Sequence, residues 1–291
     1  MLGLVGESGA GKSVTGAAVI GLLDPPGRVA GGEIRLNGER IDTLAPEDLR
    51  RLRGRRIGMI FQDPLTSLNP LYRVGDQIVE TILTHADVSP AEARRQAVAW
   101  LAEVGIPAPE RRIDAYPHEL SGGMRQRVVI ALALCAEPDL VIADEPTTAL
   151  DVSIQAQIIA LLKRLCRERS TAILLITHDM GVIAETADRV EVMYAGRIAE
   201  VGPVRAVVKS PRHPYARGLM DSIPTLATDA DRLKQIPGAM PRLLAIPRGC
   251  AFHPRCAQAF DRCRRERPEP ARIGAGAIAC FLHVPEPEPA P

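Results

Sequence analysis

The sequence GESGAGKS at residues 6–13 is the feature that most limits how this chain can fold. Its three glycines let backbone N–H groups approach an anion without interference from a Cβ atom. The apolar stretch LGLVG before it predicts a strand, and GKSVTGAAVIGLL predicts a helix whose positive end points at the same place. Lys12 adds a charge and Ser13 a hydroxyl for Mg²⁺. The pattern therefore predicts a phosphate-binding loop between a strand and a helix.

Short aliphatic segments alternate with longer helical patterns after this loop. Strands are expected at residues 32–38, 56–62, 139–144 and 171–177, and helices at residues 90–105, 122–136 and 152–168. This alternation predicts an α/β fold with a mainly parallel sheet covered by helices. The net charge of +1 gives no sign of a nucleic-acid partner. Because apolar runs stay far below the ~20 residues that span a bilayer, we expect a cytosolic protein without a transmembrane segment.

Two acidic residues follow the buried strand in LVIADEPTTALD at residues 140–151. Asp144, at the carboxyl end of this strand, is well placed to hold Mg²⁺ or its bound water. Glu145 beside it can polarise an attacking water. The alternative is a pair of solvated loop acids, which the phosphate-binding loop makes the weaker interpretation.

The sequence LSGGMRQR at residues 120–127 predicts a second anion-binding helix start, with Ser121 as its cap. One phosphate chain does not need two such ends from one subunit, so two subunits sharing a nucleotide are indicated, although a simple helix start explains the pattern when it is taken alone. Gln62 and His178 each follow a predicted strand, at the edge where parallel sheets bind ligands. Taken singly, each of these two residues is more often structural.

In this order the motifs resemble the ATP-binding subunit of ABC transporters over residues 1–209. They correspond to the Walker A loop at 6–13, the glutamine loop at Gln62, the signature LSGGM, Walker B, the ALD loop at 149–151 and the switch His178. The resemblance implies a P-loop NTPase fold of ABC type, with a helical signature subdomain at about residues 66–136. A small irregular Cys-containing extension at 210–284 and a disordered tail at 285–291 would follow.

The resemblance also implies that two such domains pair head to tail and hydrolyse ATP between them. Ser13, Gln62 and Asp144 would hold Mg²⁺. The catalytic residues would be Glu145, which polarises water, His178, which steadies the γ-phosphate, and Gln62. The nucleotide-binding residues would be Gly6, Glu7, Ser8, Gly9, Ala10, Gly11, Lys12, Ser13, Ser121, Gly122, Gly123 and Asp151.

Further segments are similar to the dipeptide and oligopeptide import subfamily, which includes nickel importers. They are IFQDPLTSLNP (60–70), HELSGGMRQR (118–127), SPRHPYARGLMDSIP (210–224), IPG (236–238) and IPRGCAFHPRC (246–256). This resemblance implies a peripheral subunit on the cytoplasmic face of the membrane, paired with a homologous ATPase subunit, two permease subunits and, indirectly, an extracytoplasmic solute-binding protein. Nickel or another small solute stays open as the cargo. A soluble ABC ATPase acting on nucleic acid is the less favoured alternative.

Four late cysteines, Cys250, Cys256, Cys263 and Cys280, have the spacing C-x₅-C-x₆-C-x₁₆-C. Zinc sites more often show tighter pairs, and disulfides are disfavoured in a cytosolic protein. Four thiolates suit a [4Fe–4S] cluster, which members of this subfamily with this pattern are understood to carry. Zinc and reduced structural thiols stay open as alternatives. We expect the group to hold a small extension together.

Members of the family carry further residues before the phosphate-binding loop, which form edge strands and supply an aromatic side chain that stacks on adenine. In this sequence no aromatic residue precedes Gly6. A start codon assigned too late and a truncated subunit are both open as explanations. For the chain beginning at Met1 we expect weakened ATP affinity.

Overall fold

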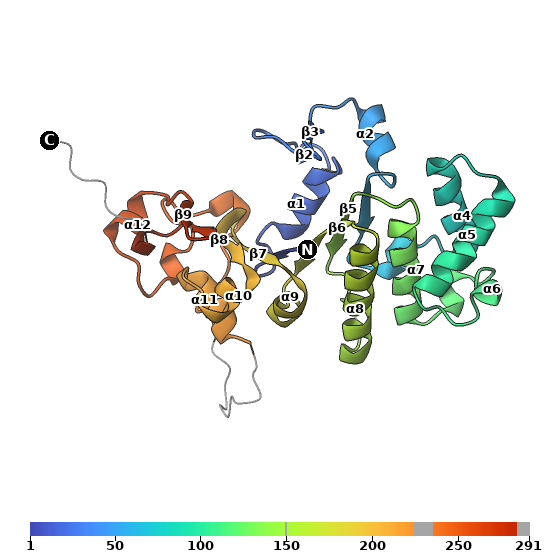
Figure 1. Cartoon of the computed structure of the whole chain (residues 1–291). Helices are drawn as coiled ribbons and strands as arrows, with labels where there is room; N and C mark the ends of the chain where they lie inside the picture. The colour runs from blue at the N-terminus through green and yellow to red at the C-terminus, as the bar shows by residue number, and fades with distance from the viewer. Residues whose placement is uncertain (149, 224–234, 284–291) are drawn as a thin grey trace. The chain divides into compact units, whose positions relative to one another are not determined.

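The computed structural model describes residues 1–148, 150–223 and 235–283 of the chain (Figure 1). The predicted tail at 285–291 and Ala149 of the ALD loop lie outside these ranges. The fold divides into two compact units, which are described separately. The first unit combines Met1–Ser13 with the chain from Leu175 onward, and the second is Val14–Leu174. Strand β6 (Ala172–Thr177) and helix α1 (Lys12–Val19) cross from one unit into the other.

The first unit contains a sheet that begins with a parallel strand pair. Strand β1 (Leu2–Val5) lies beside β7 (Arg189–Tyr194), with Leu2 opposite Arg189. The sheet continues antiparallel through β8 (Arg197–Pro203), β10 (Gly276–Ile278) and β9 (Ala271–Ile273). The last two strands come from the cysteine-containing extension, so this segment lengthens the sheet of its unit.

Short helices surround this sheet. Helix α9 (Met180–Thr186) begins at Asp179, whose carboxylate accepts hydrogen bonds from the N–H groups of Gly181 and Val182, as an N-cap does. The remaining helical segments are α10 (Val204–Lys209), α11 (Pro214–Asp221), η2 (Leu243–Ala245), η3 (His253–Arg255), α12 (Asp261–Arg265) and η4 (Phe281–His283).

An aromatic cluster joins the extension to the end of β7. The ring of Tyr194 lies 4.7 Å from that of Tyr215 and 5.2 Å from that of Phe252, measured between centroids. The rings of Tyr215 and Phe252 are 5.4 Å apart. Such edge-on and tilted pairs stabilise a core beyond the area they bury. In a chain with only 3% aromatic residues, this cluster fixes one particular place where the extension can pack.

The second unit contains the parallel pair β4 (Ile57–Ile60) and β5 (Leu140–Asp144), with Ile57 opposite Leu140. Both strands are almost wholly buried, which explains their continuous apolar sequences. With the pair β1 and β7, this arrangement confirms the predicted α/β fold with parallel strands and helices. The helices of this unit are α2 (Pro46–Leu52), α3 (Pro64–Ser67), α4 (Val74–His85), α5 (Pro90–Glu103), α6 (Pro109–Arg112), η1 (Pro117–Glu119), α7 (Gly122–Leu134) and α8 (Val152–Glu168).

One expected strand is replaced by a hairpin. The sequence predicted a single strand over residues 32–38, whereas the structure has β2 (Arg35–Leu36) paired antiparallel with β3 (Glu39–Arg40). Asn37 and Gly38 between them have φ values of +49° and +87°, which is the backbone of a two-residue turn with both central residues left-handed.

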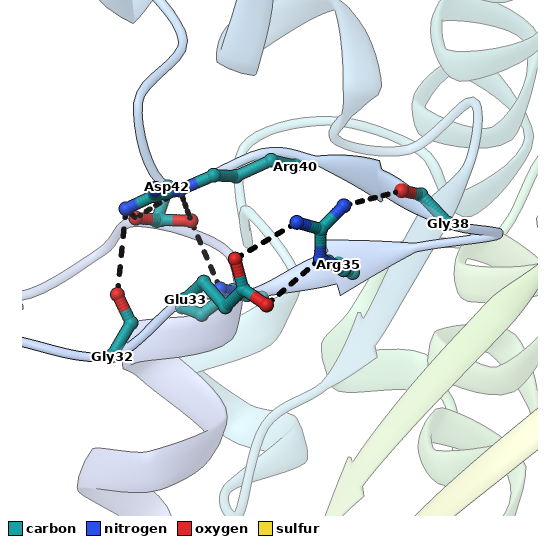
Figure 2. A network of polar contacts seen from close by, with 7 residues as sticks. Gly32, Glu33, Arg35, Gly38, Arg40 and Asp42 are labelled. Carbon is teal, nitrogen blue, oxygen red and sulfur yellow. Dashed lines mark hydrogen bonds and ion pairs between the residues drawn. The ribbon is translucent and has the colours of Figure 1, made fainter.

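Charged side chains close this hairpin (Figure 2). Asp42 accepts hydrogen bonds from Arg40 Nε at 3.0 Å and from the N–H of Ile34 at 2.9 Å. Arg35 pairs with both carboxylate oxygens of Glu33 and donates to the carbonyl of Gly38. The bonds from Arg40, followed by the bond from Ile34, lower the pKa of Asp42 to about 2.

Candidate nucleotide site

The glycine-rich loop at residues 6–13 follows β1 and packs tightly on β7. A Cβ atom at Gly6 would lie 2.3 Å from the carbonyl oxygen of Met193, so only glycine fits there. The side chain of Lys12 is buried, and its Nζ donates to the carbonyl oxygens of Gly6 at 2.9 Å and Glu7 at 3.2 Å. The ammonium group therefore lies across the loop and is held by its backbone carbonyls.

Glu7 of this loop has contacts that local sequence patterns did not indicate. Its N–H donates to Tyr215 Oη at 2.8 Å, and both oxygens of its carboxylate accept hydrogen bonds from Arg255. Burial raises the pKa of Tyr215, and the hydrogen bond to Glu7 is the main cause of a raised pKa for Arg255. These partners follow Glu7 by 208 and 248 residues, so the sequence carried no signal of them.

His178 belongs to the same unit as the loop. It is exposed, and it comes directly after β6 and directly before the N-cap Asp179 of α9. The N–H of Asp179 donates to Thr177 Oγ1 at 3.0 Å, which fixes the turn that carries the imidazole. The structure thus places His178 at the end of a strand, where the sequence predicted it.

The acidic residues and Gln62 meet in the second unit. Asp144 ends β5 and is buried, and Glu145 follows it with a φ of +46°. This left-handed conformation costs a non-glycine residue ~1–2 kcal/mol, and such strain is concentrated at functional sites. Glu145 Oε2 accepts hydrogen bonds from Gln62 Nε2 and from Thr148 Oγ1, both at 3.0 Å.

The start of α7 lies against the region between β5 and α8. Ser121 Oγ accepts a hydrogen bond from the N–H of Met124 at 3.3 Å, which is the predicted cap. A Cβ at Gly123 would lie 2.9 Å from Ile154 Cγ2, and one at Gly122 would lie 3.7 Å from Leu150 Cδ2. Asp151, an expected nucleotide-binding residue, caps α8 by accepting from the N–H of Ile154 at 2.9 Å.

The four late cysteines are all free thiols and line one small cavity of about 20 Å³ in the extension. Burial raises the pKa of Cys250, of Cys256 and, to about 11, of Cys280. Within the described ranges, no three or more His, Cys, Asp or Glu side chains are arranged to hold a metal ion. The gathering of the cysteines fits a shared role, but the structure does not bear out the predicted iron–sulfur site.

The predicted site residues fall into two groups, each within one unit. Residues 6–13 and His178 belong to the first unit. Gln62, Ser121–Gly123, Asp144, Glu145 and Asp151 belong to the second. In the part of the chain that the structure describes, no helix has the length and apolar character needed to cross a bilayer.

Comparisons with known proteins identify relatives over nearly the whole chain. Residues 1–148 match the family described as ABC transporter, and residues 199–263 match the C-terminal region of oligopeptide/dipeptide transporters. The dipeptide transport ATP-binding protein DppD of Escherichia coli (strain K12) is 49% identical over 92% of this chain and 82% of that protein. The oligopeptide transport ATP-binding protein OppD of Salmonella typhimurium is 50% identical over 98% of this chain and 85% of that protein.

A solved structure supports the same assignment. It is the dimeric post-hydrolysis state of the ATP-binding cassette MJ0796 with ADP and Pi. This structure superposes on the present chain with a TM-score of 0.62 and shares 28% sequence identity with it. The match covers 70% of the present chain and 85% of the MJ0796 chain. The predicted family is therefore confirmed. The chain belongs to the ABC transporter family and is an ATP-hydrolysing ATP-binding protein of the oligopeptide/dipeptide import type.

Proposed function

We propose that this chain couples ATP binding and hydrolysis to the import of dipeptides or oligopeptides through membrane permease subunits. The observation that carries the proposal is the presence of two matched regions in one chain. An ABC transporter region at residues 1–148 is followed by an oligopeptide/dipeptide transporter C-terminal region at residues 199–263. The names of the relatives DppD and OppD, which refer to dipeptide and oligopeptide transport, support the same cargo.

In this proposal the loop at residues 6–13 binds the phosphates of ATP. Its N–H groups and the buried ammonium group of Lys12 supply positive charge at the β- and γ-phosphates. Ser13, Gln62 and Asp144 would hold Mg²⁺, which when bound would neutralise charge on the transferred phosphate. Oxygen ligands of this kind are the ones Mg²⁺ prefers.

Glu145 polarises the attacking water. Its carboxylate is oriented by the hydrogen bonds from Gln62 and Thr148, so little reorganisation is needed when a water binds. The exposed His178 contacts the γ-phosphate. Ser121, Gly122 and Gly123, at the capped start of α7, complete the nucleotide site of a partner subunit.

The proposed assembly has a second, homologous ATPase subunit in head-to-tail arrangement and two membrane permease subunits, with a solute-binding protein on the other side. The chain would then lie peripherally on the cytoplasmic face of the membrane. It would consist of an ATP-binding domain at residues 1–209 followed by the extension at residues 210–284. The dimeric state of MJ0796 supports the pairing of ATPase subunits.

We also keep the proposal that Cys250, Cys256, Cys263 and Cys280 hold a [4Fe–4S] cluster, with zinc as the alternative. It is supported by the four free thiols around one cavity. When bound, such a group would cross-link the extension. Anaerobic purification followed by iron and zinc analysis tests this, and protein free of both metals would overturn it.

Transport in vesicles tests the cargo. The chain is co-purified with the permease and ATPase subunits that assemble with it, reconstituted with a peptide-binding protein, and supplied with ATP. We expect dipeptides or oligopeptides to accumulate and to stimulate phosphate release. Accumulation of Ni²⁺ without peptide uptake would overturn the peptide assignment and leave the ATPase assignment intact.

A further inference from the structure

A partly buried ion pair joins the loop at residues 6–13 to the extension. Arg255 Nη1 lies 2.7 Å from Glu7 Oε2, and Arg255 Nη2 lies 3.0 Å from Glu7 Oε1. Two parallel bonds between a guanidinium and a carboxylate fix direction as well as distance. The side chain of Arg255 is 6% exposed and that of Glu7 is 30% exposed, so solvent screens this pair much less than a surface ion pair.

Arg255 is itself held in place from several sides. Its Nε donates to the carbonyl oxygen of Pro237 at 2.8 Å, and Nη2 donates to that of Ile236 at 3.3 Å. Its guanidinium carbon lies 5.8 Å from the ring centroid of Tyr194 and 6.0 Å from that of Phe252. The guanidinium is therefore an ordered group aimed at the loop.

The backbone of Arg255 belongs to the turn that spaces two of the cysteines. Residues His253–Arg255 form η3, which lies between Cys250 and Cys256. The N–H of His253 donates to the carbonyl of Cys250 at 3.0 Å, and the N–H of Cys256 donates to that of His253 at 3.3 Å. Because the same turn places both cysteines and Arg255, disturbing one displaces the other.

Glu7 in turn holds the part of the loop that faces the phosphates. Its carbonyl oxygen accepts hydrogen bonds from Lys12 Nζ at 3.2 Å and from the N–H of Ala10 at 3.1 Å. Its N–H is bound to Tyr215 Oη. A shift of Glu7 would therefore move Lys12 Nζ. A small displacement of a group that positions a ligand can greatly weaken its interaction with that ligand.

Charge gives a second reason for the pair. A carboxylate on a loop that binds a triphosphate repels its ligand, because charges of like sign a few ångströms apart oppose each other strongly where solvent is scarce. The guanidinium of Arg255 cancels this charge at short range. Without Arg255, the loop would carry an uncompensated carboxylate beside the phosphate position.

We propose that Arg255 is a positioning residue of the phosphate loop, which holds Glu7 in place and neutralises it, so that ATP affinity depends on the fold of the extension around Cys250 and Cys256. The inference rests on the proposed assignment of residues 6–13 to phosphate binding. Arg255 acts through Glu7, and the extension is thereby part of the machinery that prepares the nucleotide site.

A double-mutant cycle tests the proposal through the dissociation constant for ATP, measured by titration calorimetry with the full chain. We expect Arg255→Ala to weaken ATP binding by about tenfold or more. Adding Glu7→Gln to Arg255→Ala should restore most of the lost affinity, because it removes the uncompensated charge. Arg267→Ala is the matched control, since Arg267 forms an exposed pair with Glu269 in the same extension and should leave affinity unchanged.

Wild-type affinity in Arg255→Ala, or a double variant no better than Arg255→Ala, would overturn the proposal. Should Arg255→Ala fail to fold, Arg255→Gln, which removes the charge but keeps a polar side chain at this position, takes its place with and without Glu7→Gln, and the same rescue is expected. Lys12→Ala tests phosphate binding by residues 6–13 independently of the role of Arg255. If Lys12→Ala binds ATP as tightly as wild type, the assignment of the loop to phosphate binding is wrong, whatever Arg255 does.

Discussion

Gln62 Nε2 donates a hydrogen bond of 3.0 Å to Glu145 Oε2, although the two residues are 83 positions apart. They meet because β4 and β5 run parallel, so that both strands end at the same edge of the sheet. Thr148 Oγ1, three residues after Glu145, donates a second hydrogen bond of 3.0 Å to the same carboxylate oxygen. Two donors thus fix the direction in which Glu145 presents its carboxylate.

We expect Glu145→Gln to retain ATP binding and to lose ATP turnover by about a hundredfold or more, because the amide cannot take a proton from water. Phosphate release under saturating ATP and the dissociation constant for ATP measure the two effects separately. Glu110→Gln, on the exposed surface of α6, is the matched control and should hydrolyse ATP normally. Turnover by Glu145→Gln at the wild-type rate would show that another group activates the water.

The two signature glycines should respond differently to a methyl group. A Cβ at Gly123 would lie 2.9 Å from Ile154 Cγ2, a β-branched methyl that cannot easily rotate away. We expect Gly123→Ala to lower the free energy of unfolding by ~1–3 kcal/mol. Gly122→Ala meets only ordinary contact at 3.7 Å and should keep or raise stability, since alanine favours a helix. Urea unfolding compares the two, and equal midpoints would contradict the close contact.

Asp42 should titrate far below an ordinary aspartate. Hydrogen bonds from Arg40 and Ile34 lower its pKa to about 2, so the folded chain favours the ionised form. Its contribution to stability is therefore fully present above the ordinary value of 3.8 and is lost as pH falls toward about 2.

Arg40→Gln removes the first of these donors, and the pKa of Asp42 should then rise toward its ordinary value. Carboxyl carbon chemical shifts followed by NMR measure this directly. Arg51→Gln, which removes the partner of Asp48 on the nearby α2, is the control and should leave Asp42 unchanged. Titration of wild-type Asp42 near 3.8 would show that the network in Figure 2 is not formed in solution.

Binding linkage gives a further test of the contact between Glu7 and Arg255. If the extension favours ATP binding, ATP must favour the folded extension by the same free energy. We expect ATP to slow tryptic cleavage within residues 235–283, and Arg255→Ala to abolish this protection. Cleavage of the wild-type extension at one rate with and without ATP would contradict the coupling.

Local patterns predicted the parts of the fold whose signals are themselves local. Helix α8 begins at Val152 and ends at Glu168, as expected, because the apolar spacing that predicts it repeats every few residues. The prediction of one strand over residues 32–38 was wrong, because the Asn37-Gly38 turn divides this segment into the hairpin of β2 and β3.

Contacts between distant segments were beyond the reach of such patterns. The pairing of β10 with β8 joins short strands with no periodicity of their own, so the extension was expected to be irregular. The contacts of Glu7 with Tyr215 and Arg255 depend on how the whole unit folds. The cysteine spacing was conspicuous, yet it did not determine the arrangement of the thiols, which is set by the turns at Cys250 and η3.

The pairing of β1 with β7 has a consequence for the order in which the protein is made. Leu2 finds its partner at Arg189, and Glu7 finds its partner at Arg255, so the ribosome releases the phosphate loop before the residues that support it. While the residues between Glu7 and Arg255 are being made, the nascent chain carries the glycine-rich sequence without the neighbours that shape it. The loop therefore reaches its native contacts only after the segment that carries Arg255 has been made.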